Sequence, residues 1–210
     1  MKPDTASSVE QQIILPKLNL QHMTLTLEGD TPLICHAWSE KAKKQMRDKQ
    51  MKKAKIAKEA KNPEQDFYDS LYMLDEKGAL VPQNGKPSRS GRYGFRTIAF
   101  KAAAVGACSH VDGVTKVQAR GAFHIDGEFV RIEGPPPVKR EDMVRIGMGV
   151  ADLRYRGAFE KWKVSLSIRY NANVLSAEQI VNLFNTAGFA IGVGEWRPEK
   201  DGSFGMFHGV

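Results

Sequence analysis

The residues best suited to chemistry lie in a glycine-rich segment near the end of the chain, residues 188–207, called the glycine segment below. It contains Gly192 and Gly194, followed by Trp196 and Arg197. Glycine allows positive φ and a close approach of the backbone to a partner, and successive backbone N–H groups in such turns form a concavity that binds anions. With an arginine for a phosphate and an indole for a base, the glycine segment predicts contact with a nucleic acid strand.

Signals for catalysis are weaker. His124 and Asp126 would share one face of a strand, but two side chains fall short of the three or four protein ligands that a zinc site needs. Cys35 and His36 are adjacent, so their side chains diverge and make a poor nucleophile–base pair. Asp48 is the only aspartate in a basic run, and no neighbour marks it as catalytic. We therefore predict a protein that is not an enzyme and that needs neither a metal nor a cofactor.

The positive charge of the chain is concentrated in one segment. Residues 41–61 hold nine lysines and one arginine against Asp48 and Glu59, a net charge of +8, whereas the whole chain carries +7. A localised basic segment favours a polyanionic partner more than a uniformly basic surface would. The face of a solvated helix would account for the same run, and the charge alone does not separate the two interpretations.

The remaining composition is that of a globular domain. The chain has 210 residues, of which 41% are hydrophobic, and this supports one large domain. There is no apolar run long enough to span a membrane and no secretory signal, so we expect a cytoplasmic protein. Cys35 and Cys108 are expected to be free buried thiols, although a single disulfide stays open. We expect residues 1–12 to be a disordered tail and residues 13–210 to form a single domain.

Hydrophobic patterning and capping signals predict the secondary structure. Alternation indicates strands over 18–28 and 162–170. Ser39 would cap a basic helix over 39–61, an amphipathic helix would begin near Phe95, and a capping box at Ser176 would open a helix that ends at Gly188. The other expected elements are strands at 121–126 and 128–132 joined as a hairpin, a last strand over 189–193 that resumes at 203–207, and an irregular stretch over 62–93.

The expected order is strand, helix, strand, strand, helix, strand. This order defines the α+β fold class with a ferredoxin-like (βαββαβ) core, which RNA-recognition domains also use. Two long insertions interrupt it, one over 31–93 that carries the basic helix and one over 127–160.

Three short stretches carry a family resemblance: Thr31-Pro-Leu-Ile34, Tyr93-Gly-Phe-Arg96 with the residues up to Ala103, and Ser176–Gly205. They resemble the Cas7-like RNA-binding superfamily (RAMP) of CRISPR systems, or a stand-alone or phage-borne relative of it. The resemblance implies a backbone subunit of antiviral defence that binds a crRNA-like single strand. Copies would assemble side by side as a helical oligomer with other ribonucleoprotein subunits, and the insertion at 127–160 would act as a thumb.

We therefore predict a protein that binds single-stranded RNA or DNA and oligomerises along the strand, with no membrane association. The predicted nucleic-acid-binding residues are Lys41, Lys43, Lys44, Lys52, Lys53, Arg92, Tyr93, Arg96, Lys101, Arg145, Arg154, Gly192, Gly194, Trp196 and Arg197. Two alternatives remain. One is a metal-independent endoribonuclease similar to Cas6, in which His36 activates a ribose 2′-OH. The other is a phage structural or interaction protein whose basic helix docks to an acidic protein.

Overall fold

The computed structural model describes residues 15–53, 60–82, 85–146 and 149–210. The predicted tail over 1–12 and the part of the basic helix over 54–59 lie outside the described residues. No helix in the described ranges is long and apolar enough to cross a membrane.

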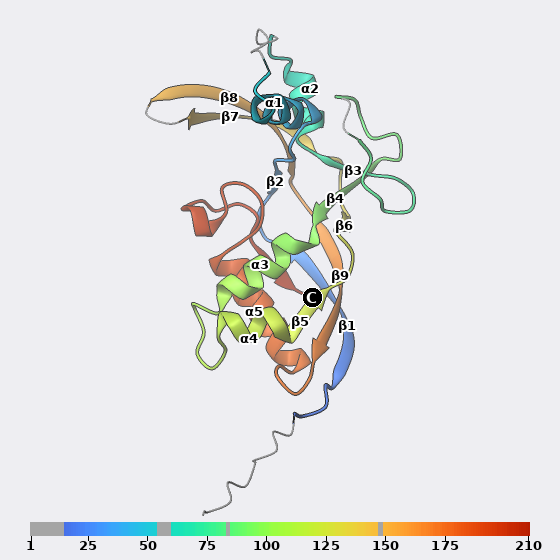
Figure 1. The fold of residues 1–210 in the computed structure, drawn as a ribbon, viewed down its shortest axis with the longest axis vertical. Helices are drawn as coiled ribbons and strands as arrows, with labels where there is room; N and C mark the ends of the chain where they lie inside the picture. The colour runs from blue at the N-terminus through green and yellow to red at the C-terminus, as the bar shows by residue number, and fades with distance from the viewer. Residues whose placement is uncertain (1–14, 54–59, 83–84, 147–148) are drawn as a thin grey trace, which may run out of the picture.

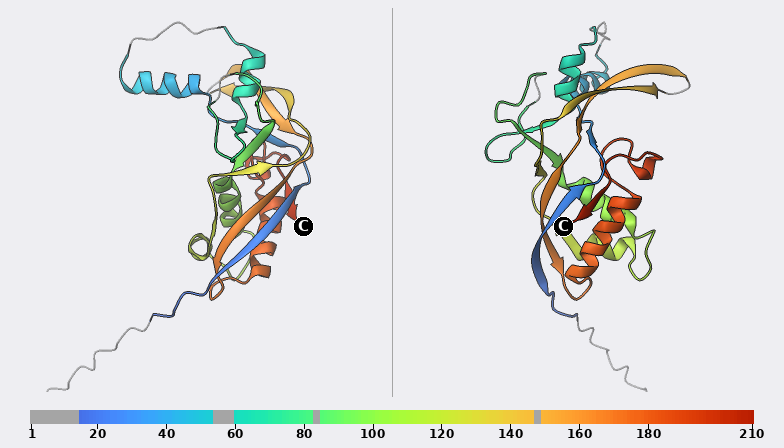
Figure 2. Two further views of the ribbon diagram at one scale, coloured as in Figure 1. Left: turned by 90° about the vertical axis from the view of Figure 1, so that its right-hand side faces the viewer. Right: turned by 180° about the vertical axis from the view of Figure 1, so that it is seen from behind.

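The core is a four-stranded antiparallel sheet with two helices on one face (Figures 1 and 2). The strands, in spatial order, are β10 (Phe207–Gly209), β1 (Leu20–Gly29), β9 (Lys163–Asn171) and β5 (Phe123–Ile125). The covering helices are α3 (Thr97–Ala107) and α5 (Ala177–Ala190), with the short α4 (Lys116–Ala122) beside them. In chain order these elements run β1, α3, β5, β9, α5, β10, so the predicted α+β fold with a ferredoxin-like core is confirmed.

Alternation along the two central strands decides which face of the sheet is buried. Leu25 lies opposite Leu166 and is buried with it beneath the helices, whereas Thr26 pairs with Ser165 on the other face. A hydrogen bond of 3.2 Å joins those two hydroxyls. Phenylalanine rings from the helices and strands fill the space between the layers, and Phe100, Phe123, Phe184 and Phe207 are fully buried.

The strands of the two insertions pair with each other. They form the end of the molecule that lies away from α4 and α5 (Figure 1). The first carries β2 (Leu33–Cys35), α1 (Glu40–Gln50), α2 (Pro63–Asp69), β3 (Tyr72–Leu74) and β4 (Arg92–Arg96); the second carries β6 (Phe129–Ile132), β7 (Val138–Ile146) and β8 (Val150–Phe159). Strand β2 pairs with β8 of the β7–β8 hairpin, and β4 pairs with both β3 and β6. The insertions therefore form two three-stranded sheets that neither could form alone.

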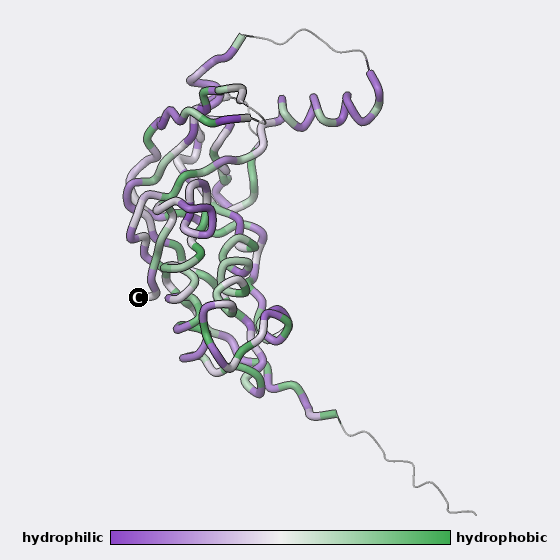
Figure 3. The backbone as a smooth tube through the Cα atoms, turned by 90° about the vertical axis from the view of Figure 1, so that its left-hand side faces the viewer, coloured by the Kyte–Doolittle hydropathy of each residue, from purple (hydrophilic) through white to green (hydrophobic). Residues whose placement is uncertain are grey.

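The prediction of one long basic helix over 39–61 was wrong at its end. Helix α1 ends at Gln50, and Lys52 has a φ of 54°, a left-handed conformation that stops a helix. Within the described residues, α1 buries no side chain and projects from the body as a largely hydrophilic helix (Figure 3). The stretch over 62–93 is irregular only from residue 75 to residue 91 within the described part, because α2 and β3 precede it. Asn62 caps the backbone N–H groups of residues 64 and 65, and Pro63 opens α2.

The prediction of the last strand at 189–193 was also wrong. Helix α5 continues through Gly188 to Ala190, and Phe189 is 75% exposed. Gly188 is a close-packing residue, because an added Cβ would lie 1.7 Å from the carbonyl oxygen of Phe207. The helix stops at Gly192, which has a φ of 67° and donates its N–H to the carbonyl of Ala187. The glycine segment therefore precedes the fourth core strand, β10.

Two further expectations need correction. The strands flanking Gly127 do not form a hairpin, because β5 pairs with β9 and β6 pairs with β4 in another sheet. Phe95 belongs to β4 and not to the first helix. The buried side of α3 is formed by Thr97, Phe100, Ala103, Ala104 and Ala107, whereas Ile98 is exposed.

Cys35 and Cys108 are free and buried, as expected.

Candidate nucleic-acid interface

The glycine segment meets the first insertion through a hydrogen-bonded histidine–glutamate pair. His36 follows β2, and its Nδ1 lies 3.0 Å from Oε1 of Glu195. The backbone N–H of Glu195 also donates to the carbonyl of Ile34 at 3.1 Å, which seats the segment along β2. The hydrogen bond with His36, with a further contribution from the charge of Arg156, lowers the pKa of Glu195. Glu195 is therefore a carboxylate at neutral pH.

Charged residues at the base of the β7–β8 hairpin hold the other side of the glycine segment. Arg156 is 5% exposed, with Nη1 at 3.4 Å from Asp142 Oδ2 and Nη2 at 3.8 Å from Glu195 Oε2. Asp142 also accepts a hydrogen bond of 2.7 Å from Arg140 Nε. The guanidinium of Arg140 lies 4.6 Å from the ring centroid of Phe204. This network fixes the segment relative to both insertions, which is the best-attested role of buried ion pairs.

Most backbone donors of the glycine segment that the structure describes are used within the protein. Val193 donates to the carbonyl of Gly205, Gly205 donates to Pro32, and Phe204 donates to Trp196. An added Cβ at Gly194 would lie 2.6 Å from the carbonyl oxygen of Ile34. Close packing on β2 explains Gly194, and close packing within the glycine segment explains Gly192 and Gly205. Contact of these glycines with nucleic acid stays a prediction.

A cavity of about 420 Å³, called the Trp38 cavity below, opens beside His36 between the start of α1 and strands β3 and β4. It is lined by His36, Ala37, Trp38, Glu40, Lys43, Tyr72, Leu80, Val81, Pro82 and Arg96. Its volume lies within the range of about 300–1,000 Å³ typical of ligand pockets. Lys43 and Arg96 are the two predicted site residues that the fold brings together here.

Arg96 is exposed and lies against two aromatic rings. Its guanidinium lies 5.9 Å from the ring centroid of Tyr72 and 5.8 Å from that of Phe129, a cation–π arrangement that holds it in place. No carboxylate among the described residues pairs with it. Lys43, in contrast, bonds to Glu40 at 2.7 Å.

The other predicted residues on the insertions and the glycine segment have mixed surroundings. Lys41 and Lys44 lie on α1, and Lys52 follows its end. Ion pairs join Lys53 to Asp48, Arg154 to Asp152 and Arg197 to Glu199. Trp196, at 40% exposure, is beside Glu195 in the glycine segment.

The last four predicted residues, Arg92, Tyr93, Lys101 and Arg145, lie in other parts of the fold. Arg92 donates to the carbonyl of Glu76 at 2.5 Å, and the ring of Tyr93 packs 5.8 Å from that of Phe159. Lys101 donates to the carbonyl of Arg120, and its burial lowers its pKa. Arg145 is exposed near the tip of the β7–β8 hairpin, where it pairs with Ala151 across the strands.

The uncovered face of the core sheet is unsuited to base stacking. RNA-recognition domains place aromatic rings on the central strands of this face. Here the outward residues of β1 and β9 are His22, Thr24, Thr26, Glu28, Lys163, Ser165, Ser167 and Arg169. None of them is a phenylalanine, tyrosine or tryptophan, and His22 is the one ring in this set. In the described ranges, no group of three or more His, Cys, Asp or Glu side chains could hold a metal ion.

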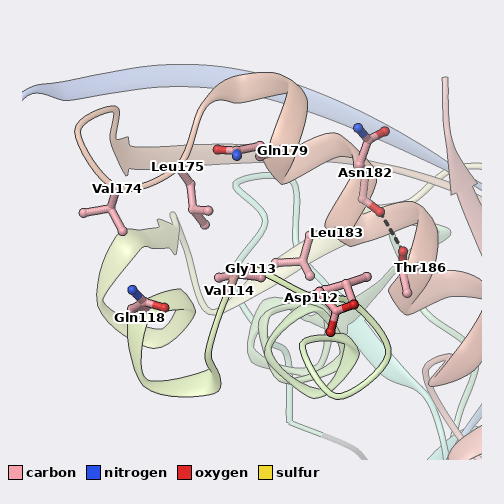
Figure 4. A pocket seen from close by; sticks show the side chains of 11 residues that line it. Asp112, Gly113, Val114, Gln118, Val174, Leu175, Gln179, Asn182, Leu183 and Thr186 are labelled. Atoms are coloured by element: carbon pink, nitrogen blue, oxygen red, sulfur yellow. Dashed lines mark hydrogen bonds between the residues drawn. The ribbon is translucent and has the colours of Figure 1, made fainter.

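A different cavity, of about 250 Å³, lies between α4, α5 and the loop before α4 (Figure 4). It is lined by Val111, Asp112, Gly113, Val114, Gln118, Val174, Leu175, Gln179, Asn182, Leu183 and Thr186. Because its lining holds no basic side chain and one aspartate, it does not suit a polyanion.

No protein-family model matches this sequence, and no curated protein sequence matches it. The structure is similar to that of Cmr6 from Pyrococcus furiosus. The two sequences are 10% identical, the match covers 92% of this chain and 100% of that chain, and the TM-score is 0.40. A likeness to Cmr6 of this degree carries no argument about function.

Sequence reasoning missed Trp38, Tyr72 and Arg156 as parts of the site. A signal for Trp38 was present, because a tryptophan directly before a helix cap and a lysine-rich run has few apolar neighbours to pack on. No comparable signal existed for Arg156. Its place beside Glu195 depends on the pairing of β2 with β8, which joins distant parts of the chain.

Proposed function

We propose that this protein binds single-stranded nucleic acid, RNA in the first instance, and does not act on it chemically. The observation that carries the proposal is that Arg96 and Trp38 line one cavity with His36, whose partner Glu195 is followed in the chain by the exposed Trp196. The two indoles are 56% and 40% exposed, and the arginine has no carboxylate partner among the described residues. Exposed rings beside cations are what a sequence-tolerant single-strand binder requires.

The charge distribution supports the same proposal. Helix α1 begins at the Trp38 cavity and carries lysines along its exposed length. These lysines extend the positive surface away from the rings, so that a strand would meet phosphate contacts on leaving the cavity. Phosphate neutralisation supplies affinity without sequence preference and makes it depend on salt.

Assembly along the strand is part of the proposal. One short groove binds weakly at physiological salt, and neighbouring copies on one strand convert weak contacts into avidity. The fold supports this with a projecting hairpin (Figure 1) and a projecting helix α1 (Figure 2, left) at one end of the molecule, where an adjacent copy could contact them.

The test is a measurement on the purified, nuclease-treated protein. We expect it to retain a labelled single-stranded RNA of mixed sequence, with affinity that falls steeply between about 50 and about 200 mM salt. The mass of the complex in size-exclusion chromatography should rise with RNA length. A monomer that retains neither RNA nor single-stranded DNA at low salt would reject the proposal and favour an interaction protein.

The His36–Glu195 pair favours one second candidate, a metal-independent endoribonuclease. A carboxylate on Nδ1 fixes the tautomer of an imidazole, and Nε2 has no hydrogen-bond partner among the described residues. His36 would take the proton of a ribose 2′-OH, whose oxygen bonds to phosphorus as the bond from phosphorus to the 5′-oxygen breaks. The 5′-oxygen leaves and takes a proton from water, and a 2′,3′-cyclic phosphate remains.

For this second candidate we expect cleavage of hairpin RNA in the presence of a chelator. His36→Ala should reduce the rate by about 100-fold or more while RNA binding is kept, and Glu195→Gln should reduce it less. An uncut RNA with the wild-type protein, or equal cutting by His36→Ala, would eliminate this candidate and leave the binding proposal intact.

A further inference from the structure

The Trp38 cavity combines a flat apolar wall with a fixed cation. Trp38, Tyr72, Leu80, Val81 and Pro82 supply the wall. Leu80 and Val81 are themselves 40% and 38% exposed. Exposed apolar residues gathered around a hollow mark a binding site more often than a random surface.

Packing within the chain does not explain Trp38. A large apolar residue directly before a helix cap usually contacts an apolar residue in the next turn. Ser39 is the cap of α1, so the corresponding position is Lys43. No aromatic ring among the described residues stacks on Trp38, and its side chain remains 56% exposed.

Cations line both of the hollows that this indole borders. Arg96 lines the Trp38 cavity and is held by the rings of Tyr72 and Phe129. A second hollow of about 270 Å³ shares His36 and Trp38 with the cavity and is lined by Arg154 and Arg156 together with Asp66 and Asp69. The guanidinium of Arg156 is already ion-paired with Asp142 and Glu195. Arg96, which has no carboxylate partner among the described residues, is therefore the arginine left to bind a phosphate.

We propose that the Trp38 cavity takes one unstacked base of a bound single strand. The base lies against the indole of Trp38, and Arg96 takes a phosphate of that nucleotide. This inference rests on the proposed function and adds that each copy removes one base from the stack. The ligand class is therefore a nucleotide with its base accessible, which excludes duplexes.

The test uses the intrinsic fluorescence of Trp38 in the full-length protein. The chain has three tryptophans, and Trp162 is 2% exposed. In a Trp196→Phe background the solvent-sensitive emission therefore comes from Trp38. We expect single-stranded RNA to quench this emission saturably and duplex RNA of the same sequence to leave it unchanged.

Affinity measurements complete the test. Trp38→Ala should weaken binding of single-stranded RNA by about tenfold or more, and Trp38→Phe should restore most of it, because a phenyl ring also stacks. Phe189→Ala, which removes an exposed ring on α5 outside the cavity, is the control and should leave the affinity unchanged. Wild-type RNA binding with no effect of Trp38→Ala, or quenching by duplex RNA, would overturn the inference and leave the proposed function standing. Failure of the wild-type protein to bind RNA or DNA would instead remove the proposed function and this inference with it.

Discussion

Alanine at Gly205 is expected to lower the free energy of unfolding by about 3–4 kcal/mol. Gly205 has a φ of 65°, which costs a residue with a side chain about 1 kcal/mol. Its added Cβ would lie 1.7 Å from the carbonyl oxygen of Val193, an overlap that costs a further 2–3 kcal/mol or so. Relief of that overlap would break the hydrogen bonds of Gly205 to Val193 and Pro32.

Gly91 provides the matched control for this substitution. Its φ of 64° is the same within a degree, but nothing lies within 4 Å of an added Cβ. Gly91→Ala should therefore cost only about 1 kcal/mol. Thermal unfolding followed by circular dichroism should show a melting temperature about 10 °C lower for Gly205→Ala and about 3 °C lower for Gly91→Ala. Equal shifts would mean that Gly205 is not packed against the carbonyl oxygen of Val193.

The second large effect is expected from the double variant Lys43→Gln, Arg96→Gln. We expect affinity for single-stranded RNA to fall by about 100-fold at low salt, because two charge-assisted phosphate contacts are lost. The slope of log K against log salt should become shallower by about 1.4, since each phosphate on a single strand contributes about 0.7. A salt titration by fluorescence anisotropy measures both quantities.

A matched control for the charge removes Lys163 and Arg169 in the same way. These two cations lie on the uncovered face of the core sheet, paired with Glu28 and Asp126. Lys163→Gln, Arg169→Gln changes the net charge of the protein equally but should leave the slope unchanged. An equal loss of affinity in both double variants would show that RNA responds to overall charge, and would contradict an interface at the Trp38 cavity.

The parts of the fold that sequence could predict are those specified by nearby residues. Strands β1 and β9 could be predicted because apolar and polar residues alternate along each of them. Helix α5 could be predicted because Ser176 and Gln179 form a capping box. The sequence predicts that Gly188 ends the helix, and this was wrong. A glycine stands there because the carbonyl oxygen of Phe207, nineteen positions later, leaves no room for a Cβ. The supposed hairpin at Gly127 failed for a similar reason, because each strand pairs with a distant partner.

In the candidate site, too, only the features that depend on nearby residues could be predicted from the sequence. Trp196, Arg96 and Lys43 could be selected from residue type and local setting, and Arg96 and Lys43 do lie in one cavity. Lys101 and Arg92 looked equivalent in the sequence, but each donates to a backbone carbonyl that only the folded chain brings near. Side-chain chemistry was therefore predictable, whereas the assignment of each charge to a partner was not.

The pairing of the two insertions also constrains how the chain can fold during synthesis. Residues 33–35 need residues 157–159 as their partners, and β1 needs β9 and β10. Until the ribosome has made these later strands, β1 and β2 have no partner strand, so only local elements such as α3 and the β7–β8 hairpin can form early. Contacts of this sequence separation slow folding and leave strand edges open to aggregation. Production of the protein should therefore benefit from slow translation at low temperature.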